Sequence, residues 1–148
     1  MPFLNPVTLT DSEMKAVLSS VIGGSNKITA ASRIALVVGK NHSLKTSSVN
    51  AVCRVSNISD MVIKSINPKI KGLGFVIACV RPRSPIKNGL GQDSGQQLWS
   101  VYRISEAAND PCFEGIDDID RIEENSPELL KLKTLNDWES AINQIIES

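Results

Sequence analysis

The sequence predicts an α+β protein that is mainly helical, with a small β-sheet and an acidic C-terminal segment that ends in a helix. Three observations support this fold class. Apolar residues recur at the three- and four-residue spacing of amphipathic helices in the first half of the chain. Near the centre, two helical segments joined by a tight turn lead through two glycines into an apolar strand. The acidic and basic residues are also divided unequally between the two ends of the chain.

The N-terminal residues predict an extended arm followed by two helices. Residues 1–9 contain two prolines and are expected to be extended. Thr10 and Glu13 have the spacing of a capping box, so the first helix should begin there and end at a pair of glycines. Thr29 is placed to cap a second helix over residues 30–38. The apolar faces of both helices are typical of a core scaffold.

Residues 46–77 predict a helix, a turn, a second helix and a strand. The first of these helices is expected from Ser47 to Arg54, with one apolar side buried. After the turn, the second helix should begin at Ser59 or Asp60, with Ser59 as its N-cap. Its buried face is expected to hold Val62, Ile63, Ile66 and Ile70.

The opposite face of this second helix carries the polar and cationic side chains that commonly contact base edges and phosphates. These are Asp60, Lys64, Ser65, Asn67, Lys69 and Lys71. Pro68 lies within the same helix, and proline removes a backbone hydrogen bond and kinks or ends a helix. We therefore expect the helix to end at Asn67, with Lys69 and Lys71 on a following turn.

Two strands are predicted after the helices, over residues 75–81 and 98–104, and they should pair as neighbours. The 16 residues between them are too many for a tight hairpin. This loop is rich in proline and glycine, and Arg81, Arg83 and Lys87 lie at its base and flank. A basic loop between two strands is what a minor-groove wing requires. The alternative is a surface insertion whose charge is incidental.

The run VSNISDMVIKSINPKIKGLGFVI, which begins at Val55, is similar to the second half of many bacterial winged-helix regulators. The longer arrangement from Leu9 to Ile104 most resembles the DNA-binding domain of the OmpR/PhoB type, over about two-thirds of the chain. The resemblance implies a winged helix-turn-helix in which the second central helix reads DNA and the loop between the strands forms the wing. Pro68 departs from the pattern of that family.

The zero net charge of the chain hides two halves of opposite sign. Residues 1–105 carry 13 lysines and arginines against four acids, a net charge of +9. Residues 106–148 carry three lysines and arginines against 12 acids, a net charge of −9. This asymmetry predicts a polyanion-binding domain over 1–105 with an acidic appendage over 106–148. The alternative is two solvated surfaces of opposite sign.

The appendage is expected to begin as an acidic linker and to end in a helix. Thr134 can cap this helix, and Asp137 lies favourably in its first turn. Leu135, Trp138, Ile142 and Ile145 form an apolar seam at helical spacing. The seam either docks on the domain or pairs with a second copy, and we favour self-association.

Several functional classes are not indicated by the sequence. The three cysteines are widely spaced and His42 is the only histidine, so neither a zinc motif nor a disulfide framework is predicted, and the thiols are expected to be reduced. No phosphate-binding glycine loop is present, and the acidic run over 114–124 lacks the pattern of a calcium loop. We expect no enzymatic activity, no metal and no cofactor. No apolar run is long enough to span a bilayer and no secretory pattern is present, so we expect a cytoplasmic location.

The leading hypothesis is sequence-specific binding of double-stranded DNA by a small transcriptional regulator that acts as a homodimer on half-sites about one helical turn apart. Contact with RNA polymerase or another protein is also considered. One alternative is a winged-helix protein-interaction module, or a DNA mimic acting through its acidic segment. Another is a replication or plasmid-maintenance protein. The residues predicted to contact DNA are Asn57, Ser59, Asp60, Lys64, Ser65, Asn67, Lys69, Lys71, Arg81, Arg83 and Lys87.

Overall fold

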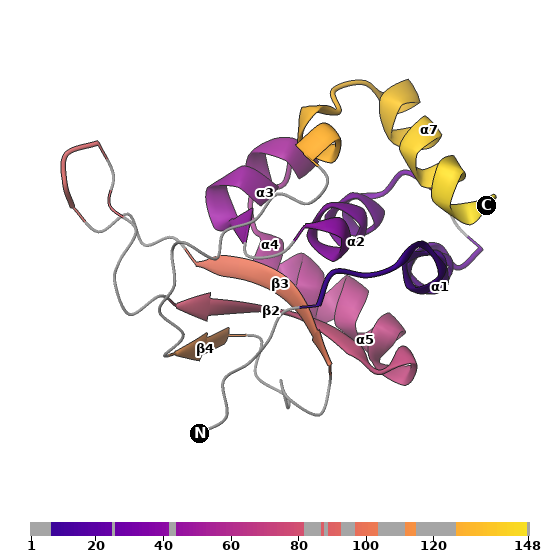
Figure 1. The fold of residues 1–148 in the computed structure, drawn as a ribbon, viewed down its shortest axis with the longest axis horizontal. Helices are drawn as coiled ribbons and strands as arrows, with labels where there is room; N and C mark the ends of the chain where they lie inside the picture. Colours follow the sequence, from indigo (N-terminus) through magenta and orange to yellow (C-terminus); the bar gives the residue numbers. More distant parts are fainter. Residues whose placement is uncertain are drawn as a thin grey trace.

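The computed structural model of the chain has an α+β fold in which helices cover one face of a small sheet (Figure 1). The structure describes residues 7–24, 26–41, 44–81, 87, 89–92, 97–103, 112–114 and 127–147. Residues 1–6 of the predicted N-terminal arm, most of the 82–97 loop, His42 and most of the acidic run lie outside these residues. Among the described residues, no helix is long and apolar enough to cross a membrane.

The first two helices begin at the predicted capping residues. Helix α1 spans Asp11–Ile22, and its capping box is present: the Thr10 N–H donates to Glu13 Oε1 at 3.0 Å, and the Glu13 N–H donates to Thr10 Oγ1 at 3.2 Å. Helix α2 spans Ala30–Lys40, with Thr29 as its N-cap. It ends two residues later than predicted. Nearly all of its side chains are buried, so α2 is the central helix of the core.

Strand β1 (Leu44–Lys45) leads directly into helix α3 (Thr46–Cys53). The Thr46 hydroxyl oxygen accepts a hydrogen bond from Trp99 Nε1 at 2.9 Å, and the Thr46 N–H donates to the Gln97 carbonyl at 3.0 Å. These bonds join the start of α3 to the sheet. Helix α3 ends at Arg54, whose φ of 56° lies in the left-handed region that terminates helices.

The second central helix is a continuous helical segment made of four parts. They are α4 (Ile58–Met61), a π-helical turn η1 (Val62–Ile66), α5 (Asn67–Ile70) and a 3-10 turn η2 (Lys71–Leu73). The predicted start at Ser59 or Asp60 was wrong, because the helix begins at Ile58. The N-cap is Asn57, whose side-chain oxygen accepts from the Asp60 N–H, whereas Ser59 lies inside the helix. The reason is tertiary: Ile58 is buried, and its burial requires the helix to include it.

The prediction that Pro68 ends this helix was also wrong. In the π-helical turn the Asn67 N–H bonds to the Val62 carbonyl, five residues back. Pro68 then lies in the first turn of α5, where proline is tolerated. The helix therefore continues through Pro68, and Lys69 and Lys71 belong to it.

The π-helical turn also explains why the predicted burial of Ile63 was wrong. A π-helical turn is one residue wider than an α-helical turn, so residues four apart stay on the same face. Val62, Ile66 and Ile70 are accordingly all buried. Ile63 was predicted to widen this buried face, but 49% of it is exposed.

The sheet has the strand order β1-β3-β2-β4. Strand β2 spans Phe75–Arg81, β3 spans Leu98–Arg103 and β4 spans Cys112–Glu114. Strand β3 is antiparallel to both β1 and β2, which confirms the predicted pairing of β2 with β3, and β4 is parallel to β2. Side chains from the helix-facing side of β2 and β3, such as Ile77 and Val101, join the hydrophobic core.

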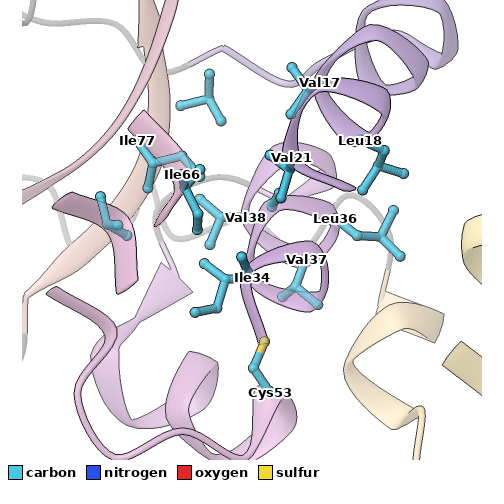
Figure 2. Close-up of a cluster of buried hydrophobic side chains, with 14 of the residues drawn as sticks. Val17, Leu18, Val21, Ile34, Leu36, Val37, Val38, Cys53, Ile66 and Ile77 are labelled. Atoms are coloured by element: carbon cyan, nitrogen blue, oxygen red, sulfur yellow. The ribbon is translucent and has the colours of Figure 1, made fainter. Parts of the chain in front are cut away.

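The core lies between the sheet and the helices and is built around α2. Figure 2 shows Ile34, Val37 and Val38 of α2 among side chains from α1, α3, the central helical segment and β2. Ile66 and Ile77, from the helical segment and β2, lie side by side at this centre. The Ile58–Leu73 segment is thus held by the hydrophobic core.

The C-terminal residues belong to the same core. A 3-10 turn η4 (Pro127–Lys131) precedes helix α7 (Leu135–Ile146), which packs on α1 on the far side from the sheet (Figure 1). Trp138 and Ile142 are buried there, so the predicted seam is used for docking within the chain. Leu135 was predicted to belong to the seam, but 68% of it is exposed.

Helix α7 also has the predicted cap. The Asp137 N–H donates to Thr134 Oγ1 at 3.1 Å, and the Thr134 N–H donates back to Asp137 Oδ2 at 3.1 Å. The hydrogen bond from the Thr134 backbone lowers the pKa of Asp137 below its ordinary value, because it stabilises the carboxylate.

We predict that the docking of α7 contributes to the stability of the whole domain. Ile142→Ala should lower the free energy of unfolding by about 2–5 kcal/mol, because it leaves a cavity against α1. Leu135→Ala, in the same helix, is the matched control and should change stability by less than about 0.5 kcal/mol. Urea denaturation followed by circular dichroism measures both. Equal stabilities of the two variants would show that α7 does not dock as described.

Candidate functional site

The exposed side of the Ile58–Leu73 segment is the candidate functional site. Its opposite side is buried against α1, α2 and β2, which fixes the direction in which the exposed side chains point. The exposed residues of the segment are Asp60, Ile63, Lys64, Pro68, Lys69, Lys71, Gly72 and Leu73, and Asn57 is exposed just before it. Ser59 and Ser65 are half-buried at its edges. The surface thus combines cations with two apolar side chains.

Lys64 is the most prominent cation of the first half of the segment. Its Nζ lies 3.9 Å from Asp60 Oδ2, one helical turn away, and both side chains are largely exposed. An exposed ion pair of this kind contributes little to stability, because water and salt screen it. Lys64 can therefore leave Asp60 for an anionic ligand at small cost.

Asn67 is engaged within the protein. Its Nδ2 donates to the Ile77 carbonyl at 2.9 Å, and its Oδ1 accepts from the Ile77 N–H at 2.8 Å. The amide thereby occupies both backbone groups of Ile77 in β2, as a neighbouring strand would. The structure thus assigns Asn67 the role of joining the helical segment to the sheet. The sequence carried no local signal for this contact, because the two residues meet only in the fold.

Lys69 is also tied to the protein. Its Nζ donates to the Val21 carbonyl at 3.2 Å, near the C-terminal end of α1. A cation at that position interacts favourably with the negative end of the helix dipole. Lys71, two residues further on, is exposed and lies close to the junction with β2.

The residues predicted for the wing are described only in part. Arg81 is the last residue of β2, so this strand ends where the sequence predicted. Lys87 is exposed, and its Nζ donates to the Gly91 carbonyl at 3.5 Å. Arg83 lies outside the described residues.

Two residues near the site were not predicted as contacts. Arg103, at the exposed end of β3, places its guanidinium 5.8 Å from the centre of the Phe75 ring, beside the junction of the helical segment with β2. Ile63 is the other, because the helical spacing placed it in the core. The charge of Arg103 and its place at the end of β3 could have indicated its exposure, whereas nothing in the sequence indicated the π-helical turn that exposes Ile63.

A groove lies away from this surface. The groove, of about 510 Å³, runs between α1, α2, η4 and α7, and its lining includes Lys40, Glu128, Asp137 and Ser140. Lys40 is already paired with Asp11 there and donates to the Leu9 carbonyl. No group of three or more histidine, cysteine, aspartate or glutamate residues that could hold a metal ion occurs in the described part of the chain.

Comparisons with known proteins found no family model, no curated protein and no solved structure that matches this chain. The resemblance to the OmpR/PhoB type is therefore a prediction from the pattern of residues alone.

We predict that Asn67→Ala lowers stability by about 1–3 kcal/mol, because it leaves the buried backbone groups of Ile77 without their partners. Hydrogen exchange of the Ile77 amide should become faster in the same variant. Lys64→Ala, in the same helical segment, is the control and should change stability by less than about 0.5 kcal/mol. An Asn67→Ala protein as stable as the wild type would contradict the bridging role.

Proposed function

We propose that the chain binds double-stranded DNA sequence-specifically through a winged helix-turn-helix, with the Ile58–Leu73 segment as the recognition helix. One observation carries the proposal: this segment is buried on one side by α1, α2 and β2 and exposes Lys64, Ile63 and Lys71 on the other. An α-helix held in this way fits the major groove, where base edges are distinguishable.

The order of the elements supports the same proposal. Helices α2 and α3 flank the short strand β1, the recognition helix follows, and β2 and β3 then form an antiparallel pair. The sheet order β1-β3-β2 places β3 between the strand before α3 and the strand after the recognition helix. In a winged helix this arrangement carries the wing loop beside the recognition helix.

Within this proposal, some residues contact base edges and others contact phosphates. Lys64, Ser65 and Ser59 lie where a recognition helix meets base edges, whereas Lys71 lies near the end of the helix and is placed for a phosphate. Asn57 and Asp60 lie at the N-terminus of the helix, close to the same edge. Asn67 and Lys69 are not among the proposed DNA contacts, because both side chains form hydrogen bonds within the protein.

The wing would be formed by the loop after Arg81, with Lys87 and Arg83 as its cations. Cations on such a loop are attracted to the negative potential of a narrow minor groove. Arg103 is a further cation beside the recognition helix. Together these groups would make binding dependent on salt, because each phosphate contact releases counterions.

The biological role that we propose is that of a small cytoplasmic transcriptional regulator which acts as a homodimer on paired half-sites. The seam of α7 is already used within the chain, so dimerisation would require another surface. Contact with RNA polymerase would use the acidic C-terminal residues.

One observation favours a different use of the acidic segment. Strand β4 pairs with β2 beside the predicted wing, and its register places Glu114 opposite Arg81 along the two backbones. An acidic segment that follows the chain at this edge would compete with DNA phosphates for the same basic residues. The alternative function is thus a module whose acidic segment occupies the DNA-binding surface and mimics nucleic acid.

We predict duplex binding whose log K falls linearly with log salt concentration, with a slope set by the number of phosphates contacted. Lys64→Ala should cost about 1–3 kcal/mol on the preferred sequence and relax preference at one base position. Lys71→Ala should weaken binding similarly on all sequences and make the slope less steep. Fluorescence anisotropy at two salt concentrations, on a selected site and on random duplexes, measures these effects.

The matched control is Lys131→Ala, which removes an exposed lysine of η4, beside α7. This variant should bind as the wild type does. Absence of duplex binding at low salt by the folded wild-type protein would refute the proposed function and favour the DNA-mimic alternative.

We predict that Ile63 contacts the methyl group of a thymine, because it is the apolar side chain exposed beside Lys64 on the recognition helix. Replacing that thymine with uracil removes one methyl group, worth about 0.8 kcal/mol or roughly fourfold in affinity. Ile63→Ala should abolish the difference between the two duplexes, whereas Leu135→Ala should preserve it. Equal binding of both duplexes by the wild type would contradict the contact.

A further inference from the structure

The groove of about 510 Å³ lies where the C-terminal residues dock on the first two helices. Helices α1 and α2 form one wall, and η4 and α7 form the other. Figure 1 shows α7 on the side of these helices that faces away from the strands. Sites for small organic molecules commonly have volumes of about 300–1,000 Å³. The groove is therefore large enough for such a molecule, and it is separate from the exposed face of the Ile58–Leu73 segment.

Apolar side chains form the floor of the groove. Leu36 of α2 and Leu129 of η4 are buried there. Leu132, Ala141 and Ile145 line the groove around them and are half-buried. A molecule that covers these half-buried side chains removes apolar surface from water, which favours its binding. The floor thus predicts a ligand with an apolar body.

The rim of the groove carries three carboxylates and one ammonium group. The carboxylates of Asp11, Glu128 and Asp137 are exposed. Lys40 forms an ion pair with Asp11, and its Nζ also donates to the Leu9 carbonyl at 3.2 Å. The charges of Lys40 and Asp11 therefore compensate each other. Among the described residues neither Glu128 nor Asp137 has a lysine or arginine partner, so the rim retains two uncompensated negative charges.

Asp137 is held in a fixed position at this rim. Its Oδ2 accepts hydrogen bonds from the Thr134 N–H at 3.1 Å and from the Lys133 N–H at 3.4 Å. These bonds, above all the one from the Thr134 backbone, lower the pKa of Asp137 below its ordinary value and keep it ionised. Both bonds go to Oδ2, so Oδ1 can accept a hydrogen bond from a ligand. A side chain that is already ordered loses little conformational freedom when a ligand binds.

We propose that this groove binds a small organic cation that carries an ammonium group on an apolar body. The apolar body covers Leu132 and its neighbours in the floor, and the ammonium group faces the carboxylates of Glu128 and Asp137. A carboxylate ligand of the same shape would meet these groups with like charge, and a neutral one would lack the attraction. The ligand contacts α2 as well as η4 and α7, so its binding stabilises the docking of the C-terminal residues.

The first experiment compares three probes that share one apolar body, namely phenylbutylamine, phenylbutanol and phenylbutyrate. Each is titrated into the isotope-labelled, full-length protein, and the amide resonances are followed by NMR. Phenylbutylamine should cause saturable shifts in η4, in α7 and in the part of α2 that contains Leu36 and Lys40. Phenylbutanol should bind about two- to fivefold more weakly for each carboxylate contact that it lacks, and phenylbutyrate more weakly still. Equal binding of the amine and the carboxylate, or shifts confined to other elements, would overturn the proposal.

The second experiment replaces one carboxylate of the rim. Glu128→Gln keeps nearly the same shape and should weaken the binding of phenylbutylamine about two- to fivefold, while that of phenylbutanol stays unchanged. Glu139→Gln is the matched control, because Glu139 is exposed on α7 beside Ser140 but does not line the groove. The control variant should bind both probes as the wild type does. Asp137 is kept in both variants because it closes the cap of α7. The same loss in both variants, or none in Glu128→Gln, would refute the site.

Thermal unfolding gives an independent measurement of the same binding. Phenylbutylamine should raise the Tm of the protein more than phenylbutanol does at equal concentration, because a ligand that binds only the folded state stabilises it. Leu132→Ala should reduce this rise for both probes, since it removes an apolar contact from the floor. A rise in Tm that is identical for all three probes would argue against a site that selects cations. None of these measurements uses DNA, so their failure and the failure of the proposed function are distinguishable.

Discussion

The packing of Val62, Ile66 and Ile70 against α2 and β2 determines the direction of every side chain in the candidate site. These three residues are completely or almost completely buried, so their helix cannot rotate without exposing them. Asn67 adds a directional restraint, because its two hydrogen bonds to Ile77 bind the helix to one position along β2. The apolar contacts thus set which face is exposed, and the amide sets the register. A surface built in this way is rigid enough for recognition by shape and hydrogen bonding.

Local signals in the sequence predicted the parts of the fold that depend on neighbouring residues. The capping residues Thr10, Thr29 and Thr134 begin the helices where expected, because a cap requires only residues three positions away. The errors arise from an irregular helical turn and from contacts between distant elements. Pro68 remains within the helix because of the π-helical turn, and Ile63 is exposed for the same reason. Of the candidate contacts, the exposure of Lys64 and Lys71 followed from helical spacing, whereas the engagement of Asn67 could not be derived from it.

The net charge of residues 1–105 overstates the number of cations that are available to bind a ligand. Arg33 donates to the Cys53 carbonyl at the end of α3, Arg54 donates to the Lys133 carbonyl just before α7, and Lys40 is paired with Asp11. These cations stabilise helix ends and connections. A count of +9 therefore supports attraction to a polyanion at long range, but only the exposed lysines and arginines can form close contacts. The placement of Lys64 and Lys71 on one exposed face is the stronger argument, because it concerns where the charge lies.

The attachment of the acidic segment differs in kind from an electrostatic association. Attraction between opposite charges on a surface weakens when the Debye length falls from about 8 Å to about 3 Å at high salt. Trp138 and Ile142 instead hold α7 by apolar burial, and β4 is held by backbone hydrogen bonds to β2. Neither kind of contact is released by salt, and apolar burial is strengthened by salts that are excluded from protein surfaces. Raising the salt concentration should therefore weaken phosphate contacts while α7 and β4 stay in place. A salt dependence of DNA binding then reports on the contacts with DNA and not on release of these two elements.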